Sequence, residues 1–208
     1  AIRENGYASL LLIGEIKDND INKFPGTDSY TLSNEGESKI YNYDSYQITT
    51  TDLRYVTGFE DIIGDQIKIF YKDGKSIELE IGNNEEILFS GVVQDYMIIT
   101  DGGMYIGGDS FRIFDLKNRK YVFYGSTYTT YKIVNSKIEY FKVVYNPYES
   151  YDSTFIKKVF NRLPKCSDEI EKLRIEIPGS IGYIEKFIYD IVTQKLERTG
   201  VYECAYFQ

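Results

Sequence analysis

The plainest alternation of apolar and polar side chains lies in residues 66–81, QIKIFYKDGKSIELEI. On either side of Asp73-Gly74 every second position is apolar, which is the period of a half-buried β-strand. A two-residue loop would mix the two faces, whereas a three-residue loop 72–74 with Gly74 at positive φ sets Ile69 opposite Ile77. The stretch therefore predicts a β-hairpin. Because two strands alone are marginal in water, further strands or a helix must cover its apolar face.

Further strand patterns follow this hairpin at short intervals. They are separated by clusters of Gly, Asp and Asn, as in antiparallel meanders, and they cover residues 87–93, 96–100, 110–116, 121–124, 128–134 and 137–145. The expected tight turns are Asn135-Ser136 and 117–119. Before the hairpin, residues 38–53 also alternate, and they predict one strand with tyrosines on one flank, at an edge or on a wet face of a sheet.

The hydrophobic period changes near Asp152. Apolar residues between positions 155 and 163 fall on one helical stripe, Asp152 or Ser153 is available as the N-cap, and Pro164 ends the run. These features predict one helix near residues 152–163, which would cover one side or one mouth of the sheet.

Residues 181–192 fit two interpretations, because the spacing of their apolar side chains suits a helix as well as a strand. However, residues 113–121 reappear in outline as 188–196: an apolar pair, Asp, an aliphatic residue, a turn, a basic residue and a return strand. This pattern resembles the hairpin found in many propeller blades, and it favours the strand.

Together these patterns predict a mainly β protein. We expect an antiparallel meander of hairpins that forms a sandwich, a barrel or a small propeller-like sheet assembly, with the single helix covering it. The chain has only four prolines and no linker-like run, so residues 1–208 are expected to form a single β-rich domain.

Composition and charge narrow the range of partners. The net charge of −8 repels phosphate backbones and anionic membrane surfaces, so no nucleic-acid partner is expected. No apolar run reaches the ~18 residues of a membrane-spanning helix, so no integral membrane segment is expected. The 21 tyrosines suit pleated surfaces that have one apolar side and one wet side.

The absence of histidine limits the chemistry. Without imidazole, the chain cannot build a Ser-His-Asp or Cys-His site, and it lacks the usual ligand of catalytic zinc, iron or copper. We therefore expect no metal and no cofactor, and we favour a non-catalytic protein. The alternative is a carboxylate-dependent glycosidase or a related His-independent hydrolase, because the chain has 32 Asp and Glu residues.

The two cysteines, Cys166 and Cys204, could form a disulfide or remain two buried thiols. A disulfide would close a loop of 38 positions (204 minus 166) and would indicate an oxidising compartment. The chain begins at Ala1 and not at Met, which would fit the removal of an export signal. We therefore expect a periplasmic, cell-surface or secreted protein, with a cytoplasmic location as the alternative.

Residues 101–109, DGGMYIGGD, form the most glycine-rich stretch and are the expected binding rim. They lack the motif of a phosphate loop, but glycines let a ligand approach the backbone closely. Together with two tyrosines of the alternating stretch 38–53, they give the candidate ligand-binding residues Asp101, Met104, Tyr105, Asp109, Tyr41 and Tyr43. The expected function is recognition of a protein or a glycan through a tyrosine-rich face, because tyrosine offers a large contact area with one polar tip.

Overall fold

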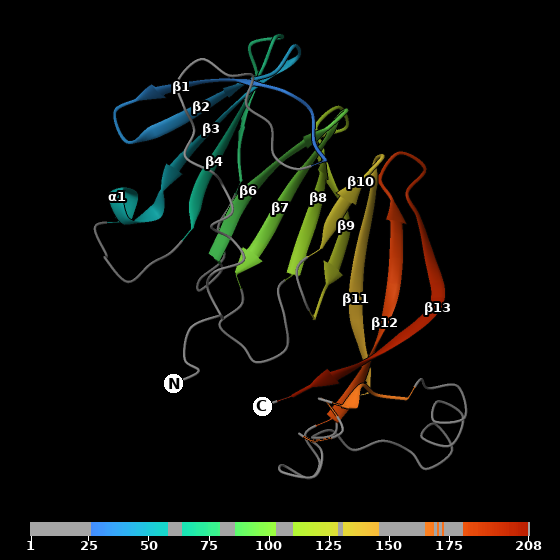
Figure 1. The fold of residues 1–208 in the computed structure, drawn as a ribbon. Coiled ribbons are helices and arrows are strands. Elements are labelled where there is room, and N and C mark those ends of the chain that lie inside the picture. Colours follow the sequence, from blue (N-terminus) through green and yellow to red (C-terminus); the bar gives the residue numbers. More distant parts are fainter. Residues whose placement is uncertain are drawn as a thin grey trace. The chain divides into compact units, whose positions relative to one another are not determined.

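The computed structural model describes residues 26–57, 64–79, 86–102, 110–128, 131–145 and 181–207, together with 165–168, 170 and 172. These residues form three antiparallel sheets and one short helix, and no sheet among them closes into a barrel (Figure 1). The mainly β meander predicted from the sequence is therefore confirmed. The predicted helix at residues 152–163 lies outside the described residues.

The first sheet has five strands in chain order, namely β1 (Thr31–Glu35), β2 (Ser38–Asn42), β3 (Tyr46–Asp52), β4 (Asp65–Tyr71) and β5 (Ser76–Glu78). The β4–β5 hairpin has the predicted three-residue loop: Gly74 has φ 81°, and Ile69 lies opposite Ile77. On the other face of this hairpin Lys68 and Glu78 form an ion pair at 3.2 Å.

The prediction of a single strand across residues 38–53 was wrong. The chain reverses after Asn42, and β2 pairs along its whole length with residues 47–51 of β3. The Tyr43 N–H donates to the Tyr46 carbonyl at 2.9 Å, and Gln47 Nε2 donates to Asn42 Oδ1 at 2.9 Å. Asn42 at the end of β2, with Asp44 and Ser45 between the two strands, supplies the turn chemistry. The helix α1 (Leu53–Thr57), which follows β3, was also not predicted.

The second sheet has four strands in chain order, namely β6 (Glu86–Val93), β7 (Tyr96–Gly102), β8 (Ser110–Asp115) and β9 (Lys120–Ser126). The third sheet also has four, namely β10 (Lys132–Val134), β11 (Lys137–Tyr145), β12 (Ile181–Asp190) and β13 (Lys195–Tyr206). The ambiguous residues 181–192 are therefore a strand as far as Asp190, as the repeated sequence pattern favoured.

The chain divides into two compact units, Ala1–Gly103 with Ser110–Tyr124, and Met104–Asp109 with Gly125–Gln208. Whether they constitute one domain, as expected, stays a prediction. In the first unit, apolar side chains of the first two sheets form a common core; among them are Ile48, Ile67, Ile69, Phe89, Met97, Ile99 and Phe114. In the second unit Ile184, Ala205 and Phe207 form a smaller buried cluster.

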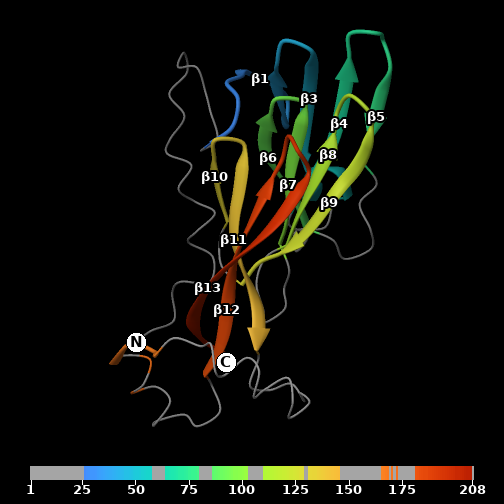
Figure 2. The same cartoon turned by 90° about the vertical axis from the view of Figure 1, so that its right-hand side faces the viewer.

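Within the second sheet, and again within the third, an equivalent backbone hydrogen bond joins two tight turns. In the second sheet, the Asp95 carbonyl in the β6–β7 turn accepts from Leu116 N at 2.8 Å. In the third sheet, the Ser136 carbonyl in the β10–β11 turn accepts from Ile191 N at 3.0 Å. Figure 2 shows the β10–β11 and β12–β13 turns side by side at one end of that sheet.

The β8–β9 turn of the second sheet and the β12–β13 turn of the third sheet also share their internal geometry. Asp115 and Asp190 each accept a hydrogen bond at 2.8 Å, through Oδ1, from the backbone N–H three residues further on. Four residues after each aspartate, Arg119 and Gln194 take positive φ values of 58° and 54°. The sequence similarity between residues 113–121 and 188–196 therefore reflects one turn that the chain uses twice.

Candidate functional site

Asp101, at the end of β7, is the described member of the expected binding rim. Its side chain is buried, and its Oδ2 atom accepts hydrogen bonds from Ser110 Oγ and Arg112 Nε, both at 2.9 Å. Its Oδ1 atom is buried without a hydrogen-bond partner among the described residues. The other members of the rim, Met104, Tyr105 and Asp109, lie outside the described residues.

Of the two candidate tyrosines, Tyr41 of β2 lies in the core of the first unit, and Tyr43, in the turn that follows, is partly buried and packs against that core. Tyr41 is only 7% exposed, and its ring packs against Phe89 with 4.7 Å between centroids. Tyr30 packs against both tyrosines, at 5.0 Å and 5.7 Å. Burial raises the pKa of Tyr41 and Tyr43 above the ordinary value for tyrosine, so both phenols stay neutral. The Tyr41 ring therefore does not line an exposed face, whereas a role of Tyr43 in binding stays a prediction.

One face of β7 and β8 in the second sheet carries both core side chains and Arg112. Met97 lies opposite Phe114, and Ile99 lies opposite Arg112, so these four side chains share one face of β7 and β8. Met97, Ile99 and Phe114 belong to the core that this sheet shares with the first sheet. Arg112 extends the same face towards the edge strand β9.

Two exposed tyrosines of β9 contact this face, and we call Tyr121 and Tyr124 the β9 tyrosine pair. Tyr121 packs edge-to-face against Phe114 at 5.2 Å, and the Arg112 guanidinium lies 5.6 Å from the centre of the Tyr124 ring. The two tyrosines are 44% and 62% exposed. The sequence pattern did not reveal this pair, because a period of two does not show which side chains stay exposed.

A second aromatic cluster joins the tight turns of the first unit. The Arg119 guanidinium lies 4.2 Å from the centre of the Tyr71 ring, and its Nη2 atom contacts Asp73 Oδ2 at 2.7 Å. Tyr46 packs edge-to-face on Tyr71 and donates its hydroxyl proton to Asp95 Oδ1 at 2.7 Å. Burial, with a smaller effect from Asp95, raises the pKa of Tyr46. These contacts connect turns of both sheets, which gives the cluster a structural role.

Asp65, at the start of β4, is a buried carboxyl group with an altered titration. Burial raises its pKa above the ordinary value, although the Phe89 N–H, which donates to its Oδ2 atom at 3.2 Å, favours the charged form. This bond joins β4 to β6, and we assign Asp65 a structural role. The described residues offer no observation in favour of the glycosidase alternative.

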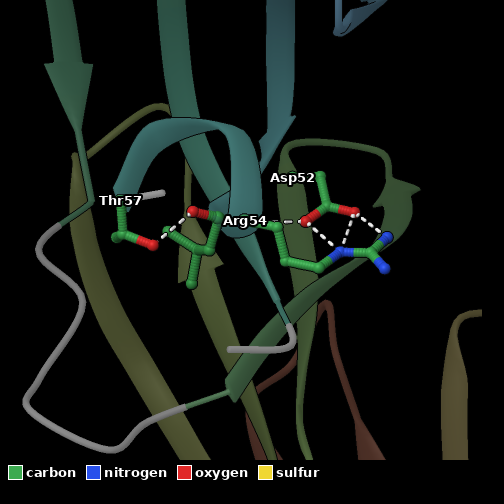
Figure 3. Close-up of polar contacts among 4 residues, drawn as sticks. Asp52, Arg54 and Thr57 are labelled. Atoms are coloured by element: carbon green, nitrogen blue, oxygen red, sulfur yellow. Dashed lines mark hydrogen bonds and ion pairs between the residues drawn. The ribbon is translucent and has the colours of Figure 1, made fainter. Parts of the chain in front are cut away.

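The polar groups of α1 satisfy one another locally (Figure 3). Arg54 contacts Asp52 through both its Nε atom, at 3.0 Å, and its Nη2 atom, at 2.5 Å, and the Thr57 hydroxyl donates to the Leu53 carbonyl at 2.8 Å. Tyr55 is 61% exposed on this helix. We assign this tyrosine no role in binding, so its substitution is the control in the binding experiments below.

Cys166 and Cys204 form a disulfide, which joins residues 165–168 to β13. Within the described segments, no helix has the length and apolar character needed to cross a membrane. In the same segments, no group of three or more His, Cys, Asp or Glu side chains is placed to hold a metal ion.

Comparison of the chain with protein-family models, with curated proteins and with solved structures found no match. A function must therefore be inferred from the described side chains. Among these, the β9 tyrosine pair combines high exposure with fixed support from neighbouring side chains, and it is the best candidate for a functional surface.

Proposed function

We propose that this protein is a non-catalytic binding module that recognises a protein or a glycan through the β9 tyrosine pair. The observation that carries the proposal is the exposure of two tyrosine rings of the edge strand β9, 44% and 62%, with Phe114 in contact with Tyr121 and Arg112 in contact with Tyr124. Rings of this kind supply a large contact area with one polar tip, and a supported ring loses little conformational entropy on binding.

The disulfide supports an extracytoplasmic location for this module. Disulfides persist in oxidising compartments such as the periplasm, the cell surface and the extracellular space, whereas cytosolic thiols are kept reduced. Cys166 and Cys204 are bonded in the structure, which agrees with a secreted, surface or periplasmic protein.

The proposal is tested by affinity capture with a matched control. Wild-type protein, the Tyr121→Ala/Tyr124→Ala double variant and the Tyr55→Ala variant are immobilised and exposed to native protein and polysaccharide fractions. Retained proteins and sugars are identified by mass spectrometry. We expect at least one species to bind wild type and Tyr55→Ala but not the double variant, because Tyr55 is as exposed as Tyr124 yet lies on α1.

Near-ultraviolet circular dichroism and a thermal melt verify that the double variant is folded. If every species retained by the wild type is also retained by the folded double variant, the β9 tyrosine pair is not the recognition surface and the proposal is wrong.

A further inference from the structure

Two turns of the first unit meet through an ion pair. Arg119 of the β8–β9 turn contacts Asp73 Oδ2 of the β4–β5 turn through its Nη2 atom at 2.7 Å, although the two residues are 46 positions apart in the chain. The Arg119 guanidinium also lies 4.2 Å from the centre of the Tyr71 ring at the end of β4. Residues 72–75 and 117–120 therefore lie next to each other, and we call them together the lysine patch.

The lysine patch concentrates positive charge on an acidic protein. It contains four lysines and Arg119 against one acidic residue, Asp73, whereas the chain as a whole has a net charge of −8. Because Arg119 and Asp73 neutralise each other, the four lysines are in excess. All four are exposed, and none forms an ion pair with another described residue: Lys72, Lys75, Lys117 and Lys120.

The ion pair keeps these lysines close together, and few carboxylates oppose them. Each lysine is one or two positions from a member of the pair, and two residues of chain span at most about 7 Å. Of the neighbouring acidic residues, Asp95 accepts the Tyr46 hydroxyl proton at 2.7 Å, and Asp115, only 3% exposed, accepts from the Asn118 amide at 2.8 Å. Asp44, exposed in the β2–β3 turn, offsets at most one of the four charges.

Hydrogen bonds fix the backbone of both turns. In the β4–β5 turn, Gly74 N donates to the Tyr71 carbonyl and Lys75 N donates to Asp73 Oδ1, both at 3.0 Å. In the β8–β9 turn, Arg119 N donates to the Asp115 carbonyl at 2.7 Å. The fold thus holds like charges near one another, and a bound anion would relieve their mutual repulsion.

The remaining negative charge of the chain does not cancel the patch at short range. The Debye length is about 8 Å at physiological ionic strength, so exposed charges farther away are largely screened. Lysine ammonium groups are hydrated point charges without the fixed fork of arginine, and they suit an anion with repeated charges better than one planar group.

The side chain that follows the patch favours a sugar chain over an acidic polypeptide. Tyr121, directly after Lys120, is 44% exposed, and the apolar C–H face of a sugar ring can pack on an aromatic ring of this kind. The disulfide between Cys166 and Cys204 agrees with a location outside the cytosol, where acidic polysaccharides occur.

We infer that the lysine patch binds an acidic polysaccharide through its carboxylate or sulfate groups. This inference goes beyond the proposed function, because the four lysines are not part of the β9 tyrosine pair.

Titration with defined polymers tests the inference. Fluorescently labelled fragments of alginate, which carries only carboxylates, of dextran sulfate, which carries only sulfates, and of neutral dextran are added to wild type and to three variants. Two variants remove patch charges, Lys72→Gln/Lys75→Gln and Lys117→Gln/Lys120→Gln. The control, Lys132→Gln/Lys195→Gln, removes the same charge from exposed positions of the third sheet. Thermal melts verify that all variants are folded.

We expect alginate or dextran sulfate to bind wild type and the control with the same affinity, and neutral dextran not to bind. Each patch variant should bind about tenfold more weakly, because it loses two of the four charges. Raising the salt concentration from about 50 mM to about 200 mM should weaken binding by the wild type more than by the patch variants. Binding of alginate alone would assign carboxylate as the recognised group, and binding of dextran sulfate alone would assign sulfate.

Three results would overturn the inference. Neither charged polysaccharide binds; or the control loses as much affinity as the patch variants, so that only net charge matters; or polyglutamate binds the lysines more tightly than both polysaccharides, which would indicate an acidic protein segment. Both tyrosines of β9 remain in every lysine variant. Lysine-dependent binding therefore stands even if affinity capture disproves the tyrosine surface, and its failure leaves that surface untouched.

Discussion

At Gly182 the absence of a Cβ atom allows neighbouring groups to pack closely against β12. It lies near the start of β12, opposite Ala205 of β13. A Cβ atom at this position would overlap the Tyr145 carbonyl oxygen and the Phe207 ring more closely than real Cβ atoms ever do. Because one of these neighbours is backbone, it cannot rotate away. Glycine is therefore required here by the close approach of other groups, and not by its backbone angle.

We predict that Gly182→Ala lowers the free energy of unfolding by about 2–3 kcal/mol, since the β11–β12–β13 packing must shift to admit a methyl group. The matched control is Gly36→Ala. Gly36 has φ 58° but open space around its Cβ position, so this change should cost only about 1 kcal/mol of backbone strain. Urea unfolding measures both values. Equal costs for the two variants would show that the overlap at Gly182 is relieved without loss.

At the scale of elements, the most informative feature is the turn type that occurs twice, between β8 and β9 and between β12 and β13. In both copies an aspartate side chain accepts a backbone hydrogen bond at 2.8 Å. The two copies differ in burial: Asp115 is 3% exposed and also binds the Asn118 side-chain amide at 2.8 Å, whereas Asp190 is partly exposed. A hydrogen bond contributes more where its loss leaves buried groups without a partner.

We therefore predict that Asp115→Ala destabilises the protein by about 2 kcal/mol and Asp190→Ala by less than about 1 kcal/mol at pH 7. Urea unfolding of the two variants beside wild type gives both differences. A larger cost for Asp190→Ala than for Asp115→Ala would contradict this ranking by burial.

The contribution of Asp190 also depends on pH. The backbone N–H of Thr193, more than any other group, lowers the pKa of Asp190 below its ordinary value of 3.8. The stabilisation is therefore complete above pH 3.8 and is lost as the pH falls through the lowered pKa. The stability difference between wild type and Asp190→Ala should accordingly shrink between pH 7 and about pH 2.

For the whole molecule, the disulfide is the strongest long-range constraint that the structure shows. Cys166 and Cys204 are separated by 38 residues, and the closed segment contains all of β12 and most of β13. Closing a loop of this length removes conformational entropy from the unfolded chain, which the chain-entropy model values at about 4 kcal/mol.

Reduction with dithiothreitol should therefore lower the free energy of unfolding by up to about 4 kcal/mol. Urea unfolding with and without the reductant measures the change. The Cys166→Ser/Cys204→Ser variant is the control, and it should match the reduced wild type and should not respond to dithiothreitol. An unchanged midpoint for the wild type after complete reduction would show that the disulfide does not stabilise the fold.

Much of the local structure followed from the sequence alone. The alternation in residues 66–81 determined the β4–β5 register, and the turn residues Asn135-Ser136 and 117–119 marked two hairpins correctly. The repeated pattern at 188–196 chose strand over helix. Such features depend on residues close in the chain, where side-chain period and backbone preference act directly. The missed reversal after Asn42 lies at the limit of this information, because alternation does not show where a strand ends.

Only the tertiary structure decided which tyrosines are buried. Tyr41 and Tyr124 both lie in alternating stretches, yet one is 7% exposed in the core and the other 62% exposed beside Arg112. A period of two tells which side chains share a face of a strand, but not which face another sheet will cover. Tyrosine suits either environment, because its ring is apolar and its hydroxyl is polar. The candidate site on β9 therefore became visible only through the exposure that packing leaves to each tyrosine.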